Sequence, residues 1–113
     1  MSQITTHILD TARGCPAVGV AIALHRLEAD VWQTVGQGVT DDDGRVSDLC
    51  PAGAALPAGT YRMHFATGEY FSALGGDVFY PWADVVFSVD ASGAHYHVPL
   101  LLSPFGYSTY RGS

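Results

Sequence analysis

Residues 60–67 read Thr-Tyr-Arg-Met-His-Phe-Ala-Thr and alternate large apolar side chains with polar or small ones. The apolar positions are Tyr61, Met63 and Phe65, each separated from the next by one residue. Because successive side chains of a strand point to opposite faces, this period predicts a β-strand with one face turned to a core. The stretch therefore favours a fold in which sheets pack against each other.

The same period recurs on both sides of this stretch, and no long helical period appears. We expect the other strands at residues 4–10, 18–27, 31–35, 78–80, 83–89, 95–102 and 107–110. A short helix is predicted at 69–74, because Gly75 and Gly76 form a strong helix stop. Seven or eight short strands with one short helix imply an all-β, two-sheet sandwich that fills residues 1–113 as a single domain.

Three connecting segments are also predicted. Residues 36–44 contain three glycines and an acidic run and are expected to be a loop, and 45–58 are expected to be mostly irregular. Residues 90–93 read Asp-Ala-Ser-Gly, which is typical of a hairpin turn. The acidic run Asp41–Asp43 is followed by Gly44, so it indicates a turn rather than a metal site.

Charge and composition exclude several classes of partner. The formal net charge is −6, with 11 acidic residues against five basic ones, whereas nucleic acids and anionic membranes require a basic face. No apolar run approaches the roughly 20 residues that a membrane helix needs, and the first residues lack a signal peptide's features. Cys15 and Cys50 form no CxxC or zinc-like spacing, which favours free thiols, with a disulfide left open. We expect a cytoplasmic protein.

Three features could carry chemistry. His7 interrupts an apolar and threonine strand, where a lone histidine is more often structural. His95 and His97 share one face of a strand, and such imidazoles suit acid–base chemistry or, with His7 as a third ligand, a metal site. His97 lies deeper in the strand and is the better candidate, so we expect His95 to matter less. The aromatic tail 103–113 is either an edge strand over the core or is held beside a ligand.

Several mechanisms have no supporting motif. The chain contains no GxSxG elbow, no GxGxxG before a helix and no P-loop, so neither a covalent nucleophile nor a cofactor is predicted. Paired carboxylates for glycoside chemistry are also not evident. Histidine, arginine and hydroxyl groups remain, and these suit the activation of a water and the stabilisation of an oxyanion.

Two stretches together resemble a known family. Residues 5–11, Thr-Thr-His-Ile-Leu-Asp-Thr, with Gly-Cys-Pro-Ala at 14–17, are similar to the opening motif of the transthyretin-related hydrolases. Residues 95–113, His-Tyr-His-Val-Pro-Leu-Leu-Leu-Ser-Pro-Phe-Gly-Tyr-Ser-Thr-Tyr-Arg-Gly-Ser, are similar to their closing motif. The resemblance implies a transthyretin-like sandwich and a homotetramer with its active sites in a channel between dimers.

The resemblance also implies a reaction and a set of site residues. The reaction is hydrolysis of 5-hydroxyisourate to 2-oxo-4-hydroxy-4-carboxy-5-ureidoimidazoline in urate catabolism, without metal or cofactor. A histidine would activate the water, and an arginine would stabilise the oxyanion. The implied catalytic residues are His7, Arg45 and His97, and the implied substrate-binding residues are Tyr110, Arg111 and Ser113.

Two alternatives stay open at this point. One is a transthyretin-like carrier that binds a small aromatic ligand in a central channel, although transthyretin lacks the catalytic histidines and the Tyr-Arg-Gly-Ser end. The other is a metal-dependent hydrolase built on His7, His95 and His97. The chain also departs from the family at 78–85, which reads Val-Phe-Tyr-Pro-Trp-Ala-Asp-Val where a Phe-Phe-Pro-Glu-Val type of stretch is usual. These positions bear on packing and loops more than on the implied site.

Overall fold

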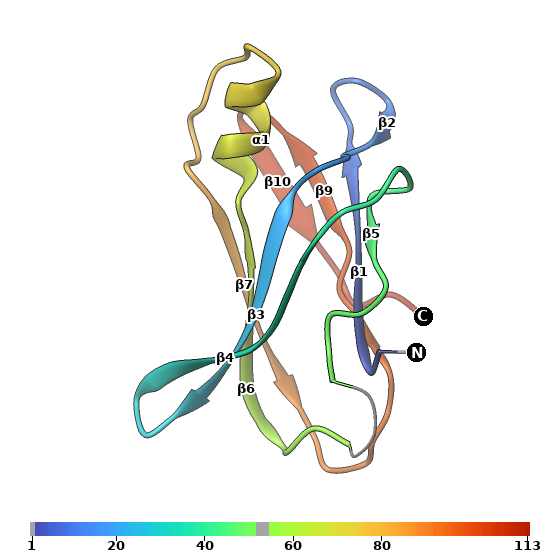
Figure 1. The fold of residues 1–113 in the computed structure, drawn as a ribbon, viewed down its shortest axis with the longest axis vertical. Helices are drawn as coiled ribbons and strands as arrows, with labels where there is room; N and C mark the ends of the chain where they lie inside the picture. Colours follow the sequence, from blue (N-terminus) through green and yellow to red (C-terminus); the bar gives the residue numbers. More distant parts are fainter. Residues whose placement is uncertain (1, 52–54) are drawn as a thin grey trace.

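A computed structural model of the chain describes residues 2–51 and 55–113, and within them it shows ten strands and one helix in a two-sheet sandwich (Figure 1). The first sheet contains β1 (Ile4–Asp10), β2 (Cys15–Pro16), β5 (Arg45–Val46), β8 (Tyr96–His97), β9 (Leu100–Ser103) and β10 (Gly106–Thr109). Its main order is β10-β9-β1-β2, and β5 and β8 also pair with β1. Strand β1 therefore lies at the centre of this sheet.

The second sheet has four antiparallel strands in the order β4-β3-β6-β7. They are β3 (Ala21–Glu28), β4 (Val31–Val39), β6 (Gly59–Phe65) and β7 (Ala83–Val89). Helix α1 (Thr67–Ala73) follows β6 directly. The predicted fold class is thus confirmed, and the expected bounds 4–10 and 83–89 agree with β1 and β7.

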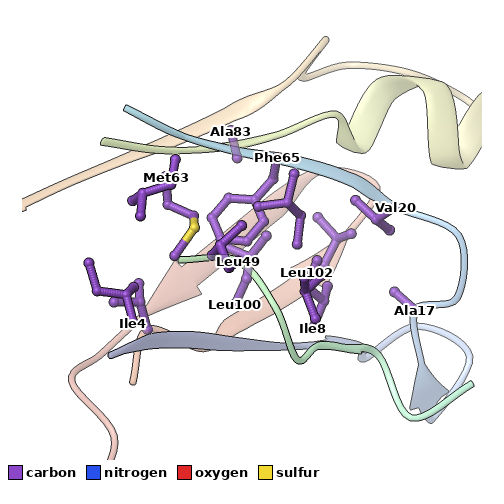
Figure 2. Packing of buried hydrophobic residues seen from close by; sticks show 14 of the residues in the cluster. Ile4, Ile8, Ala17, Val20, Leu49, Met63, Phe65, Ala83, Leu100 and Leu102 are labelled. Carbon is purple, nitrogen blue, oxygen red and sulfur yellow. The ribbon is translucent and has the colours of Figure 1, made fainter. Parts of the chain in front are cut away.

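The core lies between the two sheets and follows the predicted alternation. In β6 the side chains of Tyr61, Met63 and Phe65 are fully buried in the core cluster. Figure 2 shows Met63 and Phe65 on the opposite side of this cluster from Ile4 and Ile8 of β1. Full burial of a large apolar side chain contributes about 1.5–3 kcal/mol. The inner face of β1 is therefore held firmly, and this fixes which β1 side chains point outward.

Two predicted strands differ in the structure, and a proline is involved in each case. No strand forms at 78–80, because the carbonyl of Pro81 accepts a hydrogen bond from the Gly68 amide at 3.0 Å and draws this segment towards α1 instead of a sheet. The expected strand 95–102 is broken into β8 and β9, since Pro99 has no amide hydrogen to continue the pairing.

The glycine-rich segment 36–44 is only partly a loop. Strand β4 continues through Gly36 and Gly38 to residue 39, where a loop was expected. A Cβ on Gly36 would collide with the carbonyl oxygen of Leu49, and one on Gly38 would lie 2.6 Å from Val46 Cγ1. These glycines are therefore needed for close packing against the 45–50 segment and do not mark a turn.

Three smaller boundaries also differ. The strand expected from residue 18 starts at Ala21, after Gly19 adopts a positive φ of 80°. The turn at 90–93 exists, but it links β7 to β8 in the other sheet and so closes no hairpin. Helix α1 spans 67–73 instead of the expected 69–74.

Two further observations concern the described residues 2–51 and 55–113. None of their helices has the length and apolar character required to cross a bilayer. Cys15 and Cys50 are both free thiols, which agrees with the interpretation favoured from the sequence.

Candidate active site

Strand β1 collects side chains from distant parts of the chain on its outer face. Thr5 and His7 are half-buried there and alternate with the fully buried Ile4 and Ile8. His7 pairs with Arg45 of β5, and Thr5 pairs with His97 of β8. Because directly paired residues of neighbouring strands project to the same face, positions 7, 45 and 97 share one surface.

The acidic turn before β5 positions Arg45. The Asp41 carboxylate accepts hydrogen bonds from the backbone amides of Asp43 at 2.9 Å and Arg45 at 3.0 Å. Gly44 adopts a positive φ of 74°, and its carbonyl accepts the Ile8 amide at 2.8 Å. The predicted turn is confirmed, and it connects the Arg45 backbone rigidly to β1.

One hydroxyl lies between the two histidines of the closing motif. Thr5 Oγ1 lies 2.9 Å from Nε2 of His95 and 2.9 Å from Nδ1 of His97. The two rings are nearly parallel, with an interplanar angle of 16° and centroids 6.5 Å apart. His95 is exposed, whereas His97 is half-buried. Sequence reasoning missed Thr5, although its position two residues before His7 put it on the same strand face.

The surroundings of His97 favour its neutral form. Partial burial lowers the pKa of His97 below its ordinary value of 6.5, and the positive charges of Arg45, His95 and His7 lower the pKa further, in that order. With Nδ1 engaged by Thr5, Nε2 is the ring nitrogen left to act on a bound molecule. A neutral imidazole of this kind can accept a proton near neutral pH.

The tail is fixed against strand β8. The Gly112 amide donates a hydrogen bond to the His97 carbonyl at 2.8 Å, and the Arg111 guanidinium lies 4.5 Å from the Tyr96 ring centroid. A Cβ on Gly112 would collide with the His97 ring. The tail is therefore an edge strand, β10, that continues into a segment held beside His97.

A surface cavity of about 480 Å³ brings part of the predicted site together. Its lining includes Arg45, His97 and Ser113, and also Thr5 and His95. His7 stands beside this lining as the neighbour of Arg45 on β1. A base, a guanidinium and a hydroxyl thus surround one space large enough for a small heterocycle.

The other two predicted substrate-binding residues do not line this cavity within one copy of the chain. Tyr110 and Arg111 line a separate cavity of about 250 Å³, together with Tyr96, Val98 and residues of β7. The sequence could not reveal this separation, because the chain turns between Arg111 and Ser113 at a backbone contact with His97. Their contact with substrate stays a prediction.

The site combines nitrogen bases and a cation with the side chains of Asp41 and Asp48, which also line the cavity. Within the described part of the chain, no group of three or more His, Cys, Asp or Glu side chains is arranged to hold a metal ion. The neutral imidazole can take a proton from water, and the guanidinium can stabilise negative charge on a carbonyl oxygen. This arrangement suits hydrolysis of a small, oxygen-rich ring.

Comparisons with known proteins agree with this geometry. A family model described as the HIUase/Transthyretin family matches residues 4–112. The chain is 47% identical over 110 residues to the 5-hydroxyisourate hydrolase of Salmonella dublin, covering 97% of this chain and 80% of that protein.

Two solved structures are also similar. The 5-hydroxyisourate hydrolase of Klebsiella pneumoniae matches with a TM-score of 0.84 and 40% identity, covering 97% of this chain and 98% of that chain. Sea bream transthyretin in complex with thyroxine matches with a TM-score of 0.91 and 36% identity, covering 98% and 95% of the two chains. The fold is thus shared by an enzyme and a carrier, and the site residues must distinguish the two functions.

Proposed function

The chain belongs to the HIUase/transthyretin family, and on that premise we propose that it hydrolyses 5-hydroxyisourate in urate catabolism. The observation that carries the proposal is that Arg45, His97 and Ser113 line one cavity, with His7 beside it. Its relatives from Salmonella dublin and Klebsiella pneumoniae are named for this activity. The product would be 2-oxo-4-hydroxy-4-carboxy-5-ureidoimidazoline.

In the proposed mechanism, His97 is the general base. Its Nε2 takes a proton from a water whose oxygen attacks the ring carbonyl carbon, and the lowered pKa of His97 favours the neutral ring at neutral pH. Arg45 stabilises the resulting oxyanion. When the ring C–N bond breaks, the imidazolium returns the proton to the departing nitrogen. His7 orients the water from the adjacent position on β1.

The tail supplies the proposed substrate contacts. Ser113 would donate its hydroxyl to the substrate ring, since it lines the same cavity as His97. Arg111 would act mainly by its contact with the Tyr96 ring, which holds the tail in place. Tyr110 stays a predicted substrate contact. It does not line the histidine cavity of its own chain, so a second copy in the assembly would have to place it beside the substrate.

The assembly is proposed to be a homotetramer. Support comes from an exposed aromatic cluster beside the edge strand β10, in which Phe79 contacts Phe105 at 6.2 Å and Tyr80 contacts Tyr107 at 5.2 Å between ring centroids. Phe79 and Phe105 are 64% and 66% exposed, an extent that a second copy would reduce. Sedimentation equilibrium tests this proposal, and a fully active monomer would refute it. A cytoplasmic location also stays a prediction.

The activity is tested directly by generating 5-hydroxyisourate with urate oxidase and following its decay by absorbance. The expected result is decay well above the spontaneous rate and proportional to the concentration of added protein. The matched control is the His97→Ala variant at the same concentration. Decay no faster than the spontaneous rate with folded wild-type protein would refute the proposed function.

The alternative is a carrier of small aromatic ligands, and the likeness to sea bream transthyretin bound to thyroxine favours it. A carrier needs neither a neutral imidazole nor an adjacent guanidinium, so this alternative leaves His97 and Arg45 unexplained. Calorimetry with thyroxine discriminates the two. Tight binding without hydrolysis of 5-hydroxyisourate would favour the carrier.

A further inference from the structure

The bridge between His95 and His97 has a consequence for protonation. Thr5 Oγ1 lies at hydrogen-bonding distance from one nitrogen of each ring, 2.9 Å in both cases. A hydroxyl carries one proton and accepts with its lone pairs, whereas a neutral imidazole has one donor and one acceptor nitrogen. Thr5 can therefore donate to one ring only while it accepts from the other. The tautomers of the two histidines are coupled through this one proton.

Two arrangements satisfy all three groups. In the first, His97 Nδ1–H donates to Thr5, and Thr5 donates to His95 Nε2, which leaves His97 Nε2 unprotonated. In the second, every bond is reversed, and His97 Nε2 carries the proton. Only the first arrangement gives a base on the nitrogen that is left for the cavity.

We propose that Thr5 and His95 are positioning residues that hold His97 as its Nδ1–H tautomer, so that Nε2 is the base of the reaction. This inference rests on the proposed function and deepens it. Thr5 accepts the His97 proton, and His95 supplies the acceptor that orients the Thr5 hydroxyl. Neither residue exchanges atoms with the substrate in this role.

The structure makes this arrangement well defined. Thr5 and His97 are directly paired in the parallel β1–β8 register, and the Val98 amide donates to the Thr5 carbonyl at 2.9 Å. The Gly112 amide binds the His97 carbonyl from the other side. The two backbones are thus fixed, and the Oγ1–Nδ1 distance does not depend on a flexible loop. After proton capture, the same bond becomes charge-assisted and stabilises the imidazolium.

The first test is independent of activity. Nitrogen-15 NMR of histidine-labelled protein above pH 7.5 reports which ring nitrogen carries the proton. The expected spectrum shows His97 as the Nδ1–H form and His95 as the Nε2-unprotonated form. In Thr5→Val, which keeps the branched shape and removes the hydroxyl, His97 should become a mixture of tautomers. A wild-type spectrum with His97 protonated on Nε2 would overturn the proposal, whatever the enzyme activity.

The second test uses kinetics. Thr5→Val should lower kcat by about 10- to 100-fold, the range typical of partners that orient a functional histidine, with little change in KM. Thr5→Ser should keep kcat within about threefold, because it retains the hydroxyl. The matched control is Thr34→Val, which removes an exposed strand hydroxyl from the other sheet and should leave kcat unchanged.

The third test asks whether Thr5 and His95 act as one unit. His95→Leu should lower kcat less than Thr5→Val, and the double variant should be no slower than Thr5→Val alone, since residues of one network are not additive. If the losses of kcat in the two single variants were fully additive in the double variant, Thr5 and His95 would act separately, and the proposed coupling would be overturned. A wild-type protein that lacks hydrolase activity but gives the expected NMR tautomers would refute the proposed function and retain the arrangement.

Discussion

The outer faces of the two sheets each carry histidines and an arginine, but the surroundings of these groups differ. On the second sheet, His64 Nδ1 lies 2.7 Å from an Asp84 oxygen, and Arg62 Nε donates to His25 Nδ1 at 3.3 Å. The Arg62 guanidinium also lies 4.4 Å from the Trp32 ring centroid. On the first sheet, Arg45, His95 and His97 line one cavity together, whereas His64 lines a different cavity whose lining includes neither His25 nor Arg62.

The difference lies in the partners available to each group. On the second sheet, the Asp84 carboxylate pairs with one nitrogen of His64, and the Arg62 guanidinium is occupied by His25 and an aromatic ring. On the first sheet, a neutral hydroxyl engages one nitrogen of His97, and the positive charge of Arg45 faces the same cavity. Histidines and an arginine therefore do not make a reactive site by themselves. The first sheet differs because the neighbours of His97 are a hydroxyl and positive charges, and a guanidinium lines the same cavity.

The largest expected effect is a loss of activity on mutation of the first-sheet residues, which distinguishes them from the second-sheet histidines. His97→Ala should lower kcat/KM by about 100- to 10,000-fold because it removes the proposed general base. Arg45→Ala should cause a loss of about 100- to 1,000-fold, because it removes the proposed donor to the oxyanion. His7→Ala is also expected to be strongly impaired, while all three variants stay folded by circular dichroism.

The matched control for these variants is His64→Ala, which is expected to keep wild-type kcat/KM. If His64→Ala were as damaging as His97→Ala, the second-sheet cluster would belong to the site and the comparison would fail. His95→Ala should fall between these two variants.

The tail gives the second-largest effect. Removal of Arg111, Gly112 and Ser113 should lower kcat/KM by about 100-fold, because both a substrate contact and the support of the His97 backbone are lost. The proposed assembly should survive, since the truncation leaves β10 intact. Activity is measured at equal protein concentration against the full chain. Equal rates would show that the tail acts only as an edge strand.

A Gly112→Ala variant sharpens the test of the tail. It keeps Ser113 in the chain but introduces a Cβ that would collide with the His97 ring. We expect a loss of activity intermediate between wild type and the truncation. Wild-type activity would mean that the close approach of the tail to His97 is dispensable.

The pH dependence gives a graded effect. The pKa of His97 lies below 6.5, first because of burial and then because of Arg45, His95 and His7. The base is unprotonated above this lowered pKa, so kcat/KM should be flat near neutrality and fall about tenfold per pH unit below it. Removing a positive neighbour should raise this pKa. An NMR titration should therefore show His97 titrating at higher pH in Arg45→Gln, and a lower value there would contradict the electrostatic account.

A small effect on stability is expected at the second sheet. Asp84→Asn should reduce the free energy of unfolding by less than about 1 kcal/mol, because the His64–Asp84 pair is partly exposed and screened by solvent. Urea denaturation measures the change. Hydrolysis should be unaffected, and a marked loss of activity in a folded variant would connect the two outer faces.

Chelation is expected to have no effect. The imidazoles of the first sheet are proposed as bases, so exhaustive treatment with EDTA should leave the rate of hydrolysis unchanged. Loss of activity that added zinc restores would instead support the metal-dependent alternative built on His7, His95 and His97.

Sequence reasoning predicted the sandwich because alternation and burial agree along β1, β6 and β7. It failed where a strand depended on a distant partner. The period alone could not show that Gly36 and Gly38 pack against residues 46–49, or that the Pro81 carbonyl binds Gly68. The break in the expected strand 95–102, by contrast, could have been predicted from the sequence, because Pro99 lies within it.

Only those residues of the candidate site that lie in recognisable sequence motifs could be predicted. The resemblance named His7, Arg45, His97 and Ser113, and the structure brings these residues to one face, while their roles stay predictions. The separate position of Tyr110 could not be read from the chain, because spacing along the tail does not reveal where it turns. The bridge through Thr5 depends on a parallel register across 92 residues, which the alternation within one strand does not encode.

The parallel pairing of β1 with β8 and β9 also constrains the folding kinetics of the molecule. Contacts such as Thr5–His97 close a loop of about ninety residues. The chain loses the conformational entropy of this loop before the contacts provide any stabilisation. The hairpin contacts between β3 and β4 are far more local, the β3–β6 pairing also spans fewer residues, and both can form earlier. During refolding, the second sheet should therefore become ordered before the first, and hydrolytic activity should return only with the last phase of folding.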